Sequence, residues 1–225
     1  MKYIFSLNII LSFSTLVFGQ EYKSLIGIEG GPNTSIVTNI DYDYGNRTSE
    51  INPTIAYSTG LFFQYNFSKH ISFRTNFAFE RKGYFYHYQE CGSSACRTGI
   101  ARPYFDYIII PLLVRINFGQ KINFFVNGGP YLGFLSKAKN FDRKTYDTGI
   151  SLGLGIAIPI NKRLLISLEA RNNRGLLNVK NGYWYSMVNL VEYPDSKVFI
   201  RSTNILIGFA YKFGKKQSET KEENK

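Results

Sequence analysis

Apolar and polar residues alternate with a period of two along most of this chain. In the segment 205–213, every second residue from Ile205 to Phe213 is large and apolar, and the residues between them, apart from Leu206, are small or polar. The segment 164–172 repeats the pattern from Leu164 onward. Because successive side chains of a β-strand point to opposite faces, this period predicts strands with one apolar face and one small or polar face.

Eight segments carry the alternation, and we expect each of them to form one strand. They are 24–33, 55–67, 70–86, 104–118, 121–136, 147–160, 163–173 and 199–213. Short connections follow the second, fourth and sixth segments, as expected for tight turns. The remaining connections are long: 34–54, 87–103, 137–146 and 174–198. Since long and short connections alternate strictly, all the long ones should lie at one end of the sheet.

An even number of long strands joined in this way is typical of an outer-membrane barrel. A soluble, lipocalin-like barrel shows the same alternation with its apolar face turned inward, so periodicity alone leaves both open. Side-chain size separates them, because an eight-stranded barrel has room inside for little more than its own packed side chains. The apolar face here is made of large Phe, Tyr, Leu and Ile residues. We therefore predict an all-β fold, an eight-stranded antiparallel up-and-down transmembrane β-barrel with its apolar face outward.

Charges of both signs fall on the opposite face, which should line the lumen. We expect these charges to pair and to plug the lumen, because an unpaired charge in so narrow a space costs several kcal/mol. A conduction path is the alternative. Two further cations, Lys82 and Lys212, should sit near the mouths. The predicted interior charge network is Glu29, Arg74, Glu80, Arg115, Glu169 and Arg171.

The segment 105–118, "FDYIIIPLLVRINF", contains a long apolar run with a proline inside it. The alternation assigns Ile108 and Leu112 to the lipid face and Arg115 to the lumen. Proline cannot donate a hydrogen bond to the sheet, and a closed barrel has no free edge. We therefore expect a bulge at Pro111 and similar irregularity at Pro130 and Pro159.

Aromatic residues gather near both ends of the predicted strands, which is typical of interfacial girdles. The girdle near the long connections would contain Tyr84, Tyr86, Tyr104, Phe105, Phe134 and Tyr146. The girdle near the short turns would contain Tyr65, Phe67, Phe73, Phe124, Tyr211 and Phe213.

The two ends of the chain differ from the barrel segments. Residues 1–19 combine Lys2, a short apolar run and a small Gly19, which predicts a cleaved signal peptide; a single N-terminal anchor is the alternative. The barrel domain would span 20–213, and the polar segment 214–225 would be a disordered periplasmic tail. The net charge of +11 could suit nucleic acid, but a location in the outer membrane excludes that partner.

Export also bears on the two cysteines. Cys91 and Cys96 are expected to form a small disulfide loop in an oxidising compartment. They cannot complete a tetrahedral metal site with only two histidines in the chain. We therefore expect no metal and no cofactor.

Two stretches in the long connections are candidates for function. Tyr183, Trp184 and Tyr185 form a candidate loop-binding patch, or they pack onto the barrel rim. His87 lies near Ser93 and Ser94 and would be the base of a lipid hydrolase or acyltransferase, but the spacing matches no known motif. We expect that the protein is not an enzyme and that the barrel is monomeric. Its expected partners are outer-membrane lipid and a protein at the loops or the periplasmic side.

The sequence resembles the PorT-like outer-membrane β-barrel proteins of the Bacteroidetes. "YIIIPLLVRINF" is similar to the family's Tyr-x-x-x-Pro-Leu-Leu strand, and "FAFERKG" (77–83) is similar to its third-strand ending. The stretches "FFVNGGPYLGFL", "GISLGLGIAI", "ISLEARNNRGLLNV" and "NILIGFAYKF" follow in the family's order. One departure is that Phe213 is followed by the polar tail, whereas such chains often end on an aromatic residue.

This resemblance covers residues 24 to 213. It implies an eight-stranded barrel in the outer membrane, with both barrel termini on the periplasmic side. One founding member of the family is linked to protein secretion, and most members have no assigned activity. The resemblance therefore indicates location more than function.

Overall fold

The computed structural model describes residues 23–38, 51–91, 96–119, 122–138, 144–179 and 198–213, without the side chains of 88–91 and Ala138. These residues form nine strands. They are β1 (Ser24–Thr38), β2 (Ile51–Asn66), β3 (Ile71–Cys91), β4 (Cys96–Ala101), β5 (Tyr104–Phe118), β6 (Asn123–Ala138), β7 (Tyr146–Pro159), β8 (Leu164–Gly175) and β9 (Phe199–Phe213). No helix in this part of the chain is long and apolar enough to cross a membrane.

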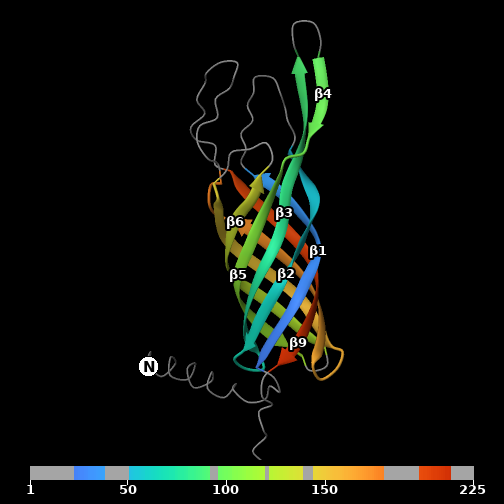
Figure 1. Ribbon diagram of the computed structural model, residues 1–225, viewed down its shortest axis with the longest axis vertical. Helices are drawn as coiled ribbons and strands as arrows, with labels where there is room; N and C mark the ends of the chain where they lie inside the picture. The colour runs from blue at the N-terminus through green and yellow to red at the C-terminus, as the bar shows by residue number, and fades with distance from the viewer. Residues whose placement is uncertain are drawn as a thin grey trace, which may run out of the picture.

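Eight of the strands close into one antiparallel barrel. The order is β2-β1-β9-β8-β7-β6-β5-β3-β4, and a further pairing of β2 with β3 closes the ring. The first and last strands are neighbours, since Ser24 lies opposite Phe213. Figure 1 shows the upright barrel, with the short turns at its lower end. The predicted eight-stranded up-and-down barrel is confirmed.

The second long connection is not the simple loop that we predicted from the sequence. β3 continues past the barrel to Cys91, and β4 returns alongside it from Cys96 to Ala101. This hairpin projects from the upper end of the barrel in Figure 1. The alternation of large apolar residues ends near Tyr86, so the pattern by itself could not show that pairing continues beyond it.

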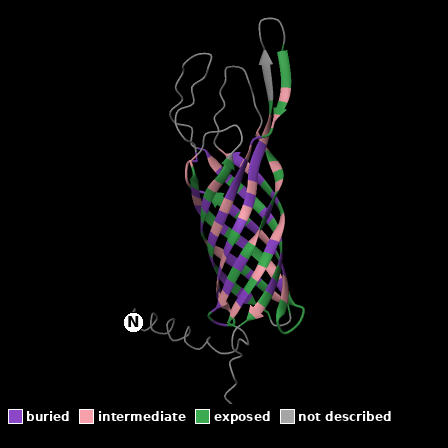
Figure 2. Ribbon diagram, in the orientation of Figure 1, coloured by how far each residue is buried: buried purple, intermediate pink, exposed green. Residues whose placement is uncertain are grey.

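Burial alternates along each strand as the sequence predicts. In β5, Leu112, Val114 and Ile116 are exposed, whereas Leu113 and Arg115 are buried. Figure 2 shows the same alternation of buried and exposed positions around the whole barrel wall. The exposed positions are largely apolar and the buried ones largely polar, which is the arrangement of a barrel whose outer wall faces lipid.

The prolines disturb the sheet less than we predicted. The register of β5 with β6 is the same on both sides of Pro111, and the shift in this pair lies instead between Asp106 and Tyr107. Pro130 pairs in regular register with Ile150, and Pro159 is simply the last residue of β7. The bulge predicted at Pro111 and the irregularity predicted at Pro159 are therefore wrong. At Pro130 the prediction is partly right, because the β5–β6 pairing lapses where Pro130 and Gly129 face β5, without a change of register. A register shift near a proline occurs in β2, between Pro53 and Ser58.

The short turns have local causes in the sequence. Gly119 adopts φ of +90°, and a Cβ there would lie 2.4 Å from the Ile122 carbonyl oxygen, so the β5–β6 turn requires glycine. In the β7–β8 turn, the Asn161 side chain accepts hydrogen bonds from the backbone N–H groups of Arg163 and Leu164, both at 2.8 Å. These turns set the register of the hairpins that they join.

The aromatic girdle near the short turns is present. Phe67, Phe124 and Phe213 are exposed on the outer wall, and the Tyr65 and Phe67 rings meet edge to face with centroids 5.2 Å apart. The upper girdle is only partly as predicted. Phe134 and Tyr146 are exposed, but Tyr84 and Phe105 are fully buried and point into the lumen. Alternation explains the correction, because Tyr84 shares the inward face of β3 with Arg74 and Glu80.

Candidate functional site

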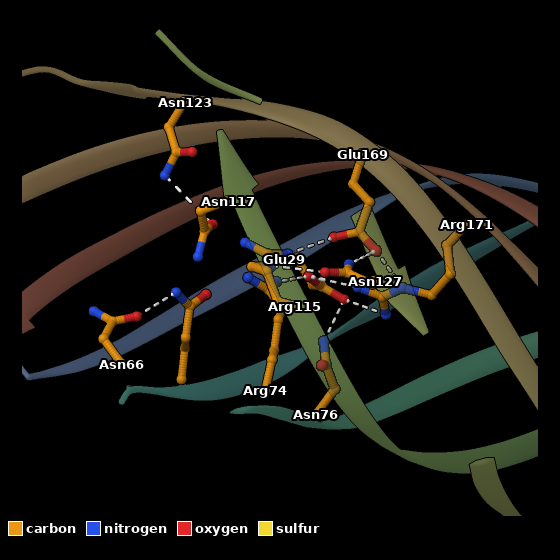
Figure 3. Close-up of polar contacts among 11 residues, drawn as sticks. Glu29, Asn66, Arg74, Asn76, Arg115, Asn117, Asn123, Asn127, Glu169 and Arg171 are labelled. Atoms are coloured by element: carbon orange, nitrogen blue, oxygen red, sulfur yellow. Dashed lines mark hydrogen bonds and ion pairs between the residues drawn. The ribbon is translucent and has the colours of Figure 1, made fainter. Parts of the chain in front are cut away.

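A connected layer of charged and amide side chains crosses the middle of the lumen. Glu29 on β1 forms ion pairs with Arg74 of β3 and with Arg171 of β8, the latter at 2.9 Å. Asn76 donates a further hydrogen bond to Glu29 at 2.5 Å. Figure 3 shows these side chains pointing toward one another from opposite walls. One carboxylate thus links three strands.

Glu169 is the second centre of this layer. It receives Arg171 Nε at 2.5 Å and Arg115 Nη2 at 3.0 Å. Asn127 donates to the same carboxylate at 2.9 Å and accepts from Arg115 Nε at 2.7 Å. Arg171 contacts both Glu29 and Glu169, so it joins the two centres into one network. Removing charge from water is costly, and multiple hydrogen bonds of this kind are what make a buried network tolerable.

Two phenylalanines support the central arginines. The Arg74 guanidinium carbon lies 3.6 Å from the centroid of the Phe62 ring, and Arg115 lies at the same distance from Phe125. A glycine makes room beside Phe125, because a Cβ on Gly155 would lie 2.6 Å from the Phe125 ring. Cation–π contacts of this kind stabilise a desolvated guanidinium.

A second charged group lies above this layer. Glu80 is 3.9 Å from Lys82 Nζ and accepts a hydrogen bond from Asn173 at 3.1 Å. Asp147 accepts a hydrogen bond from the Tyr131 hydroxyl at 2.9 Å. We expect the lumen arginines to pair with all three predicted carboxylates, and for Glu80 this is wrong, because its cation is Lys82. Lys82 lies opposite Phe105, the second residue of β5, so it is near the long-connection end as expected, although it is fully buried.

Asp147 is the functional residue that our sequence reasoning missed. It is the second residue of β7 and shares the inward face of that strand with Gly149 and Ser151, so alternation alone could have placed it in the lumen. With it, the buried lumen charges are balanced. The cations are Arg74, Lys82, Arg115 and Arg171, and the carboxylates are Glu29, Glu80, Asp147 and Glu169.

Apolar side chains close the lumen at both ends of the charged region. Toward the long connections, a buried cluster contains Val37, Tyr84, Phe105, Tyr107, Ile109, Tyr131, Val179, Val198 and Ile200. Val179 and Val198 belong to the stems of the fourth long connection and are joined by a backbone hydrogen bond of 3.0 Å. Toward the short turns, Leu25, Phe62 and Ala210 form a smaller cluster. The described side chains therefore obstruct the lumen at three levels: an apolar cluster at each end and the charged groups between them.

The remaining candidate residues lie away from the lumen. Cys91 and Cys96 are direct cross-strand partners in the β3–β4 hairpin, and Cys96 is disulfide-bonded. Tyr183, Trp184 and Tyr185 lie outside the described residues, as do the signal-peptide segment 1–19 and the tail 214–225.

The catalytic alternative finds no assembled partners in the part of the chain that the structure describes. The His87 ring is exposed and lies 6.1 Å from the ring of Phe85. Ser93 and Ser94 are outside the described residues. A hydrolase of this kind also needs an acid to orient the histidine, and Asp106, a candidate for that acid, is instead engaged by Arg81 at 2.7 and 2.9 Å. No group of three or more potential metal-ligating His, Cys, Asp or Glu side chains occurs within the described ranges.

A family model described as an outer membrane protein beta-barrel domain matches residues 18–181, which is well over half of the chain. No curated protein matches the sequence. The family is broader than the PorT-like proteins that the sequence resembles.

The chain is similar to solved structures of several outer-membrane proteins. OprG from Pseudomonas aeruginosa is 15% identical, with a TM-score of 0.53, over 87% of this chain and 98% of that chain. Neisserial surface protein A is 12% identical, with a TM-score of 0.46, over 84% and 97% of the two chains. Ail, the attachment invasion locus protein of Yersinia pestis, is 12% identical, with a TM-score of 0.40, over 85% and 99%. Only the likeness to OprG among these three exceeds a TM-score of 0.5, and it shows the fold alone.

Proposed function

Because this chain belongs to the family of outer membrane protein beta-barrel domains, we propose that it is a sealed interaction barrel of the bacterial outer membrane. It acts through its long connections and its periplasmic side rather than by transport or catalysis. A soluble, lipocalin-like binder is excluded, because the outer wall is apolar and the lumen holds eight buried charges instead of a ligand cavity. Short turns face the periplasm and long connections face outward in barrels of this class.

The observation that carries the proposal is the stack of a charged layer between two apolar clusters across the lumen. Arg171 bridges Glu29 and Glu169 across the middle, and the apolar clusters lie above and below this layer. Moving an ion through this region would require breaking several buried ion pairs, those of Glu29 and Glu169 among them, in a space of low dielectric constant. Such pairs are strong when complete and expensive when broken.

Planar-bilayer recording tests the sealed lumen directly. We expect the full-length protein to insert without a steady conductance. As a matched comparison, a variant with Arg115, Glu169 and Arg171 all replaced by alanine removes the bridge while changing net charge by only one. The apolar clusters above and below the network remain in this variant, so we expect it to stay closed as well. A steady conductance of this variant alone would show that the charged layer, and not the apolar clusters, is the seal. A large, steady conductance of the unaltered protein would rule out the proposal.

The segment 181–187, which contains Tyr183, Trp184 and Tyr185, is our candidate for the partner-binding surface. Large aromatic side chains often anchor protein interfaces, and loops held by a rigid scaffold often carry the binding residues. Replacing 181–187 by a Gly/Ser linker of equal length should leave barrel assembly intact and reduce crosslinking to partners in the native envelope. The same replacement of 40–46 in the first long connection is the control. Loss of assembly in the 181–187 variant would mean that the segment packs on the rim instead.

Membership of the PorT-like group, and with it a role in secretion, is the finer part of this proposal. Its support is the order of the strand motifs from Tyr107 to Phe213. Depletion of the protein in its own organism should then cause secreted proteins to accumulate in the periplasm. Unchanged secretion after complete depletion would restrict the function to binding at the surface.

A further inference from the structure

The outer wall of the barrel carries an unusual pair of like charges. Arg174 of β8 and Arg201 of β9 lie directly opposite each other in the sheet, and both side chains are exposed. Opposite positions in antiparallel strands place Cβ atoms about 5 Å apart, where like charges repel. Neither arginine forms an ion pair with any residue that the structure describes.

Arg81 is a cation on the same outer wall that does have an acidic partner. Its guanidinium makes two hydrogen bonds to the Asp106 carboxylate, at 2.7 and 2.9 Å. The rings of Tyr104 and Tyr57 flank it, at 4.6 and 5.4 Å. Arg174 and Arg201 have no such arrangement among the described residues, so their charges are available to an external anion.

All the described acidic side chains are buried, and the one among them that lies on the outer wall, Asp106, is held by Arg81. The buried carboxylates are Glu29, Glu80, Asp106, Asp147 and Glu169. No described carboxylate therefore competes with an outside anion for Arg174 and Arg201.

The position of the pair along the wall indicates what kind of anion reaches it. Successive outward pairs of β8 and β9 run from Leu168–Ile207 through Ala170–Ile205 and Asn172–Thr203 to Arg174–Arg201. Asn172 and Thr203 are joined by a hydrogen bond of 2.9 Å. The wall thus changes from apolar to neutral polar to cationic within a few residues, as expected where a strand leaves hydrocarbon and enters the headgroup layer.

The length of the strands places the two arginines at the same depth in the membrane, near the headgroup layer. Arg174 follows Leu164, at the short-turn end of β8, by ten residues, and Arg201 precedes Phe213 by twelve. A rise of about 3.3 Å per residue and a tilt of about 40° put them roughly 25 and 30 Å above that end. The apolar band of such barrels is about 25 Å tall. Both guanidinium groups therefore lie at the headgroups of the leaflet on the long-connection side.

We propose that Arg174 and Arg201 together form a binding site for a phosphate group on the headgroup of an outer-leaflet lipid. Guanidinium groups bind phosphate through paired hydrogen bonds, and one bridging anion removes the repulsion between the two arginines. The apolar wall below them, at Ile205 and Ile207, contacts the acyl chains of the same lipid. The site does not depend on the sealed lumen or on any protein partner.

Lipid binding to matched variants tests this site. The full-length protein is placed in phosphatidylcholine nanodiscs with phosphorylated lipid A, with dephosphorylated lipid A, or with neither. Bound lipid is counted by native mass spectrometry. The variants are R174Q, R201Q and the double variant, and K162Q is the control because Lys162 is an exposed cation in the β7–β8 turn at the opposite end. All are checked for folding by their gel shift on heating.

We expect the unaltered protein and K162Q to retain phosphorylated lipid A equally and to retain little of the dephosphorylated form. Each single variant should weaken retention about tenfold, since each loses charge-assisted hydrogen bonds. Equal retention by the double variant, or an equal loss in K162Q, would overturn the site. Inorganic phosphate added to lipid-A-free nanodiscs separates the two phosphate sources: binding as tight as that of lipid A would indicate a free-anion site and overturn the lipid assignment.

Discussion

Ser35 and Gly83 exchange two hydrogen bonds, although they belong to β1 and β3 and β2 lies between these strands in the barrel. The Ser35 hydroxyl donates to the Gly83 carbonyl at 3.0 Å, and the Gly83 N–H donates to Ser35 Oγ at 2.7 Å. The contact lies where the β2–β3 register shifts between Pro53 and Ser58. An inward side chain therefore satisfies backbone groups that the interrupted ladder leaves without a strand partner.

Removing the Ser35 hydroxyl, a single atom, should have a large effect on stability. Ser35→Ala should lower the free energy of unfolding by about 1–3 kcal/mol, because both Gly83 backbone groups become unsatisfied in a buried place. Urea unfolding in phospholipid vesicles measures the change. The control is Ser202→Ala, because Ser202 lies directly opposite Ser35, is equally buried, and makes no hydrogen bond through its hydroxyl within the described residues. Equal losses in the two variants would show that the Ser35 bonds contribute little.

Because Arg74 and Arg171 share the Glu29 carboxylate, substitutions of these residues should have coupled effects on the free energy of unfolding. Glu29→Gln should destabilise the barrel by about 3–5 kcal/mol, because Arg74 and Arg171 lose an ionised partner in a buried site. Combining it with Arg74→Met removes the stranded charge, so the double variant should be less destabilised than the sum of the two single variants. The same unfolding assay gives all three values. Simple additivity would mean that the two side chains do not act as a pair.

The β5–β6 turn predicts a contrast between two glycines of one hairpin. Gly119→Ala should cost about 1–2 kcal/mol, because Gly119 has φ of +90° and a Cβ would meet the Ile122 carbonyl oxygen. Gly128→Ala should change stability by less than about 0.5 kcal/mol, since its Cβ would make only an ordinary contact of 3.4 Å with Leu152. Thermal gel-shift midpoints of the two variants compare them directly. A tolerant Gly119 would contradict the turn geometry.

The disulfide between the hairpin cysteines should stabilise only the β3–β4 hairpin. Closing a loop as short as Cys91–Cys96 should contribute no more than about 2–3 kcal/mol, and that stabilisation acts outside the barrel wall. Reduction, or replacement of both cysteines by serine, should therefore speed amide exchange in β4 and leave exchange in β5 and β9 unchanged. Hydrogen exchange with mass spectrometry resolves these segments. Two titratable thiols in freshly purified protein would show that the bond does not form.

The sequence by itself determined the eight strands of the barrel wall and which way their side chains point. A period of two is a local property of a strand, so the alternation in 104–118 or 199–213 separates lipid-facing from lumen-facing residues without any knowledge of neighbours. Size then decided which face is outside, because the large apolar side chains could not fit within an eight-stranded lumen. The same parity also places Asp147 and Tyr84 inside, where a consistent application of the pattern would have put them.

Only the tertiary structure decided which inward residues meet. Arg171 contacts Glu29, which is 142 positions away in the sequence, because the stagger of β8, β9 and β1 brings the two residues to one height. The same stagger brings Asn173 to Glu80, 93 positions away, whereas Lys82 neighbours Glu80 on the inward face of β3 itself. Pairing beyond the barrel in β4 and the adjacency of Arg174 and Arg201 likewise depend on register. The register between two strands is set by many weak contacts along their whole length. It therefore cannot be predicted from any single stretch of sequence.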